Sequence, residues 1–322
     1  MSTDDWRLKQ RSTLSHRYTF LDQLERGPFG QWIQGEDAVT DAWVQILELD
    51  RARFPREALP ALASLIASDD ELEVHDNIEF SRTLACDEDG RAYLITVPSP
   101  GDSLRARLQV DSGWSWAACR ALVIEVGEAL AHAHDLGRVH GGLCPEVIRI
   151  DGEQLPRPQL TITGFGLAAI ADRHDQREWR GSSPYTAPEL HGGYPAHHGS
   201  DVYALGVLLW ELAAGRRPFR PTRVPIFDAE RRRATLLGRD CPSELDALLD
   251  LALAPDPDER FADIHEFLDT LQALTEPCEF GQLPAANTGW EGGELLSAIS
   301  GLEPAALRLV RRHIDALLSG EH

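Results

Sequence analysis

Short apolar segments separated by turn residues dominate roughly the first hundred residues. Between Tyr18 and Leu47 they have the pattern of a β-meander, with a tight turn at residues 27–30. A helix is predicted over about Pro55 to Ala67. Residues 77–86 and 91–97 then flank an Asp-Gly turn, which predicts a β-hairpin. This part of the chain is therefore predicted to be a small β-sheet with one helix.

Beyond the break at residues 98–101 the apolar positions recur with a helical period. Helices are predicted over Trp116–Leu136, Ser200–Gly215 and Pro242–Ala254. Residues 277–293 resemble a linker. After it, Pro304–Leu318 is predicted to be an amphipathic helix, and its apolar face consists of Leu307, Val310, Ile314 and Leu317.

Composition excludes several classes of protein. The 322 residues are 43% hydrophobic, which is enough for a large core, and no run of about 18 apolar residues could span a membrane. Met1 to Arg17 is polar and lacks the apolar stretch of a signal peptide, so a cytoplasmic location is expected. The net charge of -21 disfavours nucleic acid and anionic membranes as partners. Five widely spaced cysteines indicate neither a disulfide framework nor a zinc site.

Several motifs carry chemical meaning, and they occur in a fixed order. Residues 139–147 read V-H-G-G-L-C-P-E-V and resemble the kinase catalytic loop V-H-R-D-L-K-P-E-N. Residues 163–168 resemble T-D-F-G-L-A, and residues 185–189 resemble the Y-x-A-P-E that closes the activation segment. Residues 200–206 match S-D-V-Y-S-L-G, and residues 256–260 lie where D-P-x-x-R is expected. The chain therefore resembles the bacterial Hanks-type Ser/Thr protein-kinase family.

This resemblance implies an α+β fold with two lobes. A small β-rich N-lobe would carry the αC helix, and a larger α-helical C-lobe would follow. The predicted units are a polar segment at 1–17, a kinase-like domain at 18–274 and a linker with an amphipathic helical extension at 275–322.

The same resemblance implies that the charged catalytic positions are replaced. Phosphoryl transfer depends mainly on positioned charges. The β3 lysine that holds the phosphates falls on Gln45, and the catalytic-loop aspartate falls on Gly142. The two magnesium ligands fall on Val147 and Gly164, so no metal or other cofactor is expected. The chain's only lysine, Lys9, precedes the fold.

The nucleotide-binding positions are altered as well. The first glycine of the G-x-G-x-x-G loop is replaced by a carboxylate that would repel phosphates. The adenine-contacting positions carry larger side chains, which would fill the pocket unless a register slip makes one or both indoles ordinary core or surface residues. The altered loop positions are Glu25, Gly27 and Gly30, and the pocket positions are Trp32, Trp43 and Arg149.

Positions whose role in the family is structural are mostly kept. Glu189 and Arg260 are expected to form a buried ion pair between the end of the activation segment and the base of the C-lobe. The kept structural positions are Glu57 of the αC helix, His140, Phe165, Glu189, Asp201 and Arg260.

From these substitutions we predict a catalytically inactive pseudokinase, not an enzyme, that acts as a protein-binding scaffold or allosteric regulator. Its protein partner is not specified by the sequence. Two alternatives stay open: a sensor that binds ATP without metal, and an atypical transferase with the kinase fold.

Overall fold

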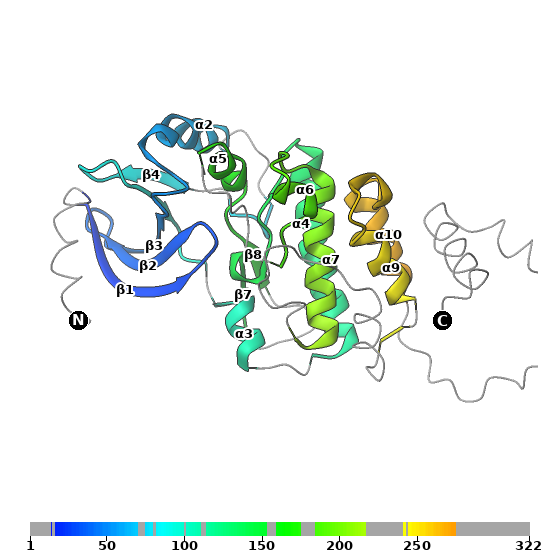
Figure 1. Cartoon of the computed structure of the whole chain (residues 1–322). Helices are drawn as coiled ribbons and strands as arrows, with labels where there is room; N and C mark the ends of the chain where they lie inside the picture. The colour runs from blue at the N-terminus through cyan, green and yellow to red at the C-terminus, as the bar shows by residue number, and fades with distance from the viewer. Residues whose placement is uncertain are drawn as a thin grey trace, which may run out of the picture.

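The structure is a computed structural model with two lobes (Figure 1). It describes residues 14, 17–69, 75–79, 82–99, 101–110, 114–152, 159–174, 184–216, 241–242 and 244–274. Lys9 and the predicted C-terminal helix lie outside these residues.

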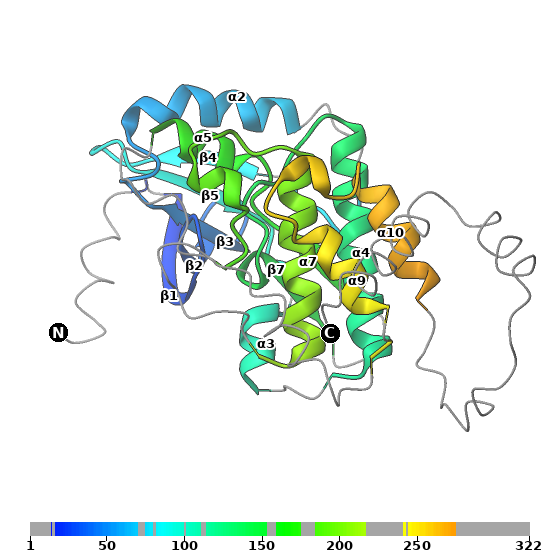
Figure 2. The ribbon, with the colours of Figure 1, turned by 45° about the vertical axis from the view of Figure 1, so that its right-hand side comes forward.

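The N-lobe is built on a five-stranded antiparallel sheet with the order β1-β2-β3-β5-β4. The strands are β1 Tyr18–Arg26, β2 Gly30–Asp37, β3 Ala42–Leu49, β4 Arg82–Cys86 and β5 Ala92–Thr96. A 3-10 turn, η1 (Arg56–Ala58), leads into helix α2 (Leu59–Asp69), which covers the sheet (Figure 2). The predicted meander, helix and hairpin are thus confirmed.

Glycine is required where β2 begins. A Cβ on Gly30 would lie 1.9 Å from the carbonyl oxygen of Glu48 on β3, so no side chain fits there. The β4–β5 hairpin turns at Gly90, whose φ of 76° is favourable only for glycine. Both positions of this sheet therefore favour glycine.

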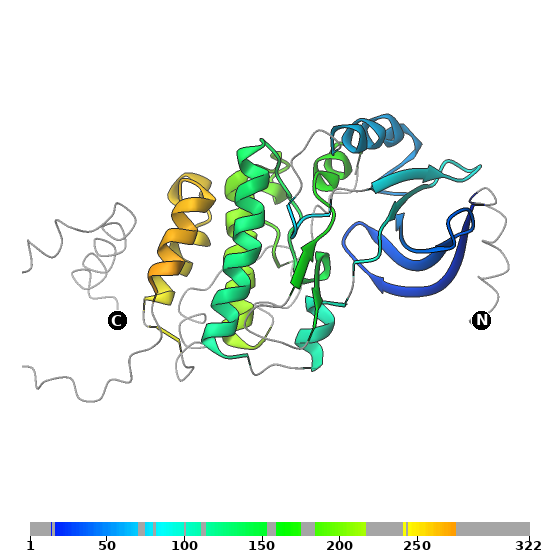
Figure 3. The ribbon, with the colours of Figure 1, turned by 180° about the vertical axis from the view of Figure 1, so that it is seen from behind.

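The C-lobe is mostly helical. Its long central helices, α4 (Trp116–Asp135) and α7 (His198–Ala214), lie side by side (Figures 1 and 3). Ser115 caps α4 by accepting a hydrogen bond from the Ala118 amide, and Gly215 ends α7 with a φ of 65°. The remaining helices are α3 Leu104–Val110, η2 Pro145–Val147, α5 Leu167–His174, α6 Pro188–His191, α9 Leu245–Ala252, η3 Pro257–Glu259 and α10 Ile264–Ala273.

A second, three-stranded sheet lies at the junction of the lobes, with the order β6-β7-β8. Its strands are β6 Asp102–Ser103, β7 Ile148–Asp151 and β8 Gln159–Ile162. Ile78, from the segment before β4, pairs with Ile162 of β8, and this bridge connects the two lobes behind the cleft.

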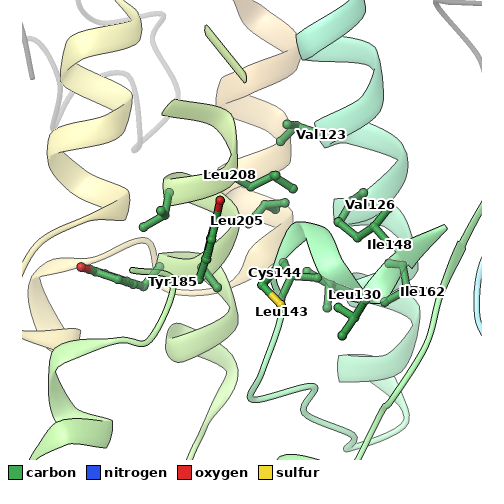
Figure 4. Close-up of a cluster of buried hydrophobic side chains, with 14 of the residues drawn as sticks. Val123, Val126, Leu130, Leu143, Cys144, Ile148, Ile162, Tyr185, Leu205 and Leu208 are labelled. Atoms are coloured by element: carbon green, nitrogen blue, oxygen red, sulfur yellow. The ribbon is translucent and has the colours of Figure 1, made fainter. Parts of the chain in front are cut away.

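The apolar core fixes the loop that precedes β7. Leu143 and Cys144 of this loop point into the same cluster as Val126 and Leu130 of α4 and Leu205 of α7 (Figure 4). All these side chains are buried. Tight packing against α4 and α7 therefore holds the backbone of residues 140–144 in place. Among the helices that the structure describes, none is long and apolar enough to cross a bilayer.

Candidate functional site between the lobes

The loop that matches the kinase catalytic loop is fixed by buried polar contacts. The Asp201 carboxylate on α7 accepts hydrogen bonds from the backbone amides of His140 and Gly141, both at 2.8 Å, and from His134 Nε2 at 2.9 Å. Burial alone would raise the pKa of Asp201, but the hydrogen bond from His134 and the other contacts lower it. The predicted structural role of Asp201 is confirmed.

His140 and Phe165 also pack as predicted. The two rings meet edge to face with their centroids 4.7 Å apart, and His140 Nε2 lies 3.1 Å from the carbonyl oxygen of Thr163. Burial lowers the pKa of His140, so the ring is neutral at pH 7. The contacts that hold this loop in place are therefore retained.

Phe29 fills the space in front of the loop. It lies at the tip of the β1–β2 turn, yet its ring is only 3% exposed, because the turn folds down between the lobes. The Asp50 amide donates to the Phe29 carbonyl oxygen at 2.9 Å, and the Arg53 guanidinium lies over the ring, 5.6 Å from its centroid. Phe54 meets the ring edge-on at 6.4 Å.

The two glycines that replace the family's aspartates make room for this ring. A Cβ on Gly142 would lie 2.9 Å from Phe29 Cζ, and a Cβ on Gly164 would lie 2.7 Å from Phe29 Cε2. Gly164 also has a φ of 89°, which disfavours any side chain. Val147, at the position of the other metal ligand, is buried in the core. Sequence reasoning identified the missing carboxylates but not the phenylalanine that takes their place.

Gln45 does not occupy the place that the sequence analysis gave it. Gln45 pairs with Thr96 of β5. Thr96 is the last residue of that strand, which leads into the connection between the lobes. The side-chain amide of Gln45 donates to the Ser99 carbonyl oxygen at 3.3 Å and accepts from the Ser99 amide at 3.4 Å. Leu47, the next residue on that face of β3, is buried and lies further into the cleft. The assignment of Gln45 to a phosphate-facing position is therefore wrong. The error is two residues, which is the spacing of neighbouring side chains on one face of a strand.

The indoles behave differently from each other. Trp32 is 6% exposed and packs in the core near Gly27, so it does fill space beneath the sheet. Trp43 is 59% exposed, and its predicted intrusion into the cleft is wrong. Trp43 lies at the outer end of β3, one residue from the β2–β3 turn. The alternative of a surface indole is confirmed for Trp43.

Glu25 and Arg149 form an ion pair across the mouth of the cleft. Arg149 Nη1 lies 2.7 Å from Glu25 Oε1, and Arg149 Nη2 donates to the Gly101 carbonyl oxygen at 2.6 Å. The other Glu25 oxygen accepts from the Ser103 hydroxyl. Arg149 thus pairs with a carboxylate and links β1 to the C-lobe sheet. Both residues were singled out from the sequence, but their contact required the fold.

Glu57 is not part of the site. It lies on η1, before α2 begins, and its side chain is exposed. Inside α2, Leu62 is fully buried, and Leu65 lies where a Cβ on Gly166 would come within 2.6 Å. The predicted role of Glu57 on the αC helix is therefore wrong, because apolar side chains form the inner face of that helix.

The predicted ion pair between Glu189 and Arg260 is confirmed. Arg260 Nη1 and Nη2 donate to Glu189 Oε1 and Oε2 at 2.9 and 2.7 Å, which is a bidentate geometry. The Arg260 side chain is fully buried.

Sequence reasoning missed a buried carboxylic acid at the connection between the lobes. The amide of Glu79 donates to the Ile162 carbonyl oxygen at 3.0 Å, and its Oε1 accepts from the Ser99 hydroxyl at 3.4 Å. Burial raises the pKa of Glu79 to about 7, although the nearby Arg82 charge opposes the shift. Its position directly after the apolar Ile78 was the only sequence signal.

This acid predicts a pH dependence of stability. Between the ordinary pKa of 4.5 and about 7 the folded chain binds more protons at Glu79 than the unfolded chain does, so the free energy of unfolding should fall as pH rises through that window. A shift of this size corresponds to roughly 3 kcal/mol. In urea titrations from pH 4.5 to 8, Glu79→Gln should remove this part of the slope. The exposed Glu88→Gln should leave it unchanged; equal slopes for wild type and Glu79→Gln would contradict the prediction.

Comparison with solved structures defines the class first. The kinase domain of Mycobacterium tuberculosis PknI, as a C20A_R136A double mutant, superposes with a TM-score of 0.64 at 21% identity, covering 80% of this chain and 95% of that one. Rad53 1–466 in complex with AMP-PNP gives a TM-score of 0.64 at 18% identity, covering 81% and 67%. The two-lobed architecture is therefore that of protein kinases, and the predicted α+β kinase-like fold is confirmed.

The sequence comparison then gives the family. The model of the protein kinase domain matches residues 18–271. The chain is 31% identical to serine/threonine-protein kinase PkaB of Streptomyces coelicolor over 64% of this chain and 50% of that protein. It is 27% identical to serine/threonine-protein kinase PknA of Mycobacterium tuberculosis over 81% and 62%. The chain spans about half the length of such relatives. This chain belongs to the protein kinase domain family.

These comparisons correct one prediction. The expectation that the chain is not an enzyme is contradicted, because the matching family is that of the protein kinase domain and the relatives are named as serine/threonine-protein kinases. The replaced residues at 142, 147 and 164 describe the site but do not outweigh this family assignment.

Proposed function

We propose that this chain is a protein-binding regulator of the bacterial serine/threonine-kinase family, which works in the cytoplasm and whose lobes are held together by its own side chains. The observation that carries the proposal is the burial of Phe29 between the lobes, against the positions of Gly142 and Gly164. The Glu25–Arg149 ion pair supports it at the mouth of the same cleft. A cleft filled in this way fixes the relative position of the lobes, and a fixed surface is suited to recognition by a protein partner.

Phosphate transfer is the second candidate function, and the names of the relatives favour it. For this chain, transfer would require Phe29 to leave the space between residues 142 and 164, since a phosphate group and the ring cannot share it. A nucleotide sensor that binds ATP without metal has the same requirement.

Thermal unfolding of the full chain with ATP, with and without Mg²⁺, tests the proposal. A regulator with a filled cleft should show the same Tm in all conditions, because a ligand raises Tm only if it binds the folded state. A rise in Tm with ATP alone would favour the sensor. A rise that requires Mg²⁺, together with transfer of labelled phosphate to a generic protein substrate, would replace the proposal by the kinase activity.

A further inference from the structure

A groove runs along the outer side of the C-lobe, between helices α4 and α10. The groove has a volume of about 360 Å³, and it lies away from the cleft between the lobes. One wall is a single face of α4, with residues at helical spacing from 128 to 135, and the other is a single face of α10, from 265 to 272. Each face extends over eight residues, a rise of about 10 Å along the helix. The lining residues are His75, Glu128, Ala131, His132, Asp135, His265, Leu268, Asp269 and Gln272.

The groove combines an apolar floor with acidic walls. Ala131 and Leu268 are buried and form the apolar part. Glu128 and Asp269 are exposed carboxylates on opposite walls. Asp135 Oδ1 lies 3.2 Å from His265 Nε2, and the rings of His75 and His132 pack with their centroids 4.9 Å apart. A fitting occupant therefore has an apolar face with cations beside it.

We propose that this groove binds the chain's own segment Pro304–Leu318. The segment has the apolar positions of an amphipathic helix. It carries three arginines and one aspartate, a net charge of +2 in a chain of net charge -21. Arg308 and Arg311 lie three residues apart and so fall on one side of such a helix. Leu307 and Ile314 would then meet the apolar floor, while these two arginines, which share one flank of the helix, would meet the carboxylate of one wall.

The groove lies close to the point where the chain leads on to the segment 304–318, so the segment can reach it. Helix α10 forms one wall, Gln272 lines it, and the described chain ends two residues later at Leu274. The 29 residues from 275 to 303 separate this point from the segment. At about 3.3–3.6 Å per residue, 29 residues can reach well beyond the length of the groove, and the covalent connection gives the segment a high effective concentration there. The short amphipathic helix also needs a surface to be stable in water.

Amide hydrogen exchange on the full chain, followed by mass spectrometry, tests this proposal. Amides of residues 304–318 should be protected in the wild type. Glu128→Arg with Asp269→Arg should raise their exchange by about tenfold, which corresponds to about 1.4 kcal/mol. Adding Arg308→Glu and Arg311→Glu to that variant should restore protection, because the charges are then exchanged between the two surfaces. The matched control reverses two exposed acids of the N-lobe, Glu36→Arg with Glu88→Arg, and should leave the exchange unchanged.

Three results would overturn the proposal. The segment could be unprotected in the wild type, which would mean that it does not dock. It could be protected but insensitive to the groove charges, which would place it on another surface. Protection that rises with protein concentration would make the occupant a second copy of the chain.

Discussion

Replacing Arg260 by methionine should lower the free energy of unfolding by about 3–5 kcal/mol, because the change leaves a buried carboxylate without its partner. The described contacts left to the Glu189 carboxylate would then be the Ser200 hydroxyl at 2.7 Å and the exposed ring of His197 at 3.4 Å. The Arg260 guanidinium also donates to the carbonyl oxygens of Ala254 and Gly199 at 2.8 and 2.9 Å, and these acceptors would lose their donor. Urea denaturation at pH 7 measures the loss.

The matched control for Arg260 is Arg51→Met, which removes an exposed arginine and should change stability by less than about 0.5 kcal/mol. A second test uses the pair itself. Glu189→Gln with Arg260→Met should be less destabilising than the sum of the single changes, because the stranded charge is then absent. Additive effects, or a loss below about 1 kcal/mol for Arg260→Met, would contradict the interpretation.

The Glu189–Arg260 ion pair also predicts how the stability of the fold changes with pH. Burial would raise the pKa of Glu189, but the hydrogen bonds from Arg260 and Ser200 outweigh it and lower the pKa. The stabilisation is therefore complete above the ordinary pKa of a glutamate and disappears as pH falls through the lowered value. The cost of Arg260→Met should accordingly shrink in acid.

Replacing Phe29 by alanine should cost about 3–5 kcal/mol, which is typical of a buried aromatic side chain. The ring is almost fully enclosed, and the cavity left behind would adjoin the backbone of Gly142 and Gly164. The change should also make the cleft accessible, so protection of the 140–144 amides against hydrogen exchange should fall. Chemical denaturation and exchange on the same sample separate the two effects.

A double-mutant cycle shows whether the ring and the glycine are matched. Gly142→Ala should cost about 1–3 kcal/mol in the wild type, because the added methyl would overlap the ring. In the Phe29→Ala background the same change should cost much less. The control is Gly27→Ala in the same turn, where a Cβ would make an ordinary 3.5 Å contact with Trp32. Equal costs of Gly142→Ala in both backgrounds would show that Phe29 does not occupy the space as described.

The sequence by itself determined the elements and the scaffold. Apolar spacing and turn residues predicted the meander, the hairpin and the helices α4, α7 and α9, because these depend on neighbours within one segment. The ordered motifs predicted the two-lobed fold, a structural role for Asp201 and the ion pair of Arg260 with Glu189. The pairing of Arg260 with Glu189 was expected from the motifs that the family shares.

Only the tertiary structure decided what fills the cleft. Trp43 and Gln45 share one face of β3, but how far each lies from the C-lobe depends on the pairing register and on what covers the strand end. Phe29 reaches Gly142 because a turn more than a hundred residues away folds onto the catalytic loop, and no local pattern records that contact. Glu25 meets Arg149 for the same reason. The buried acid Glu79 was hidden because its environment comes from three separate segments, and burial, which raises its pKa, is a property of their packing.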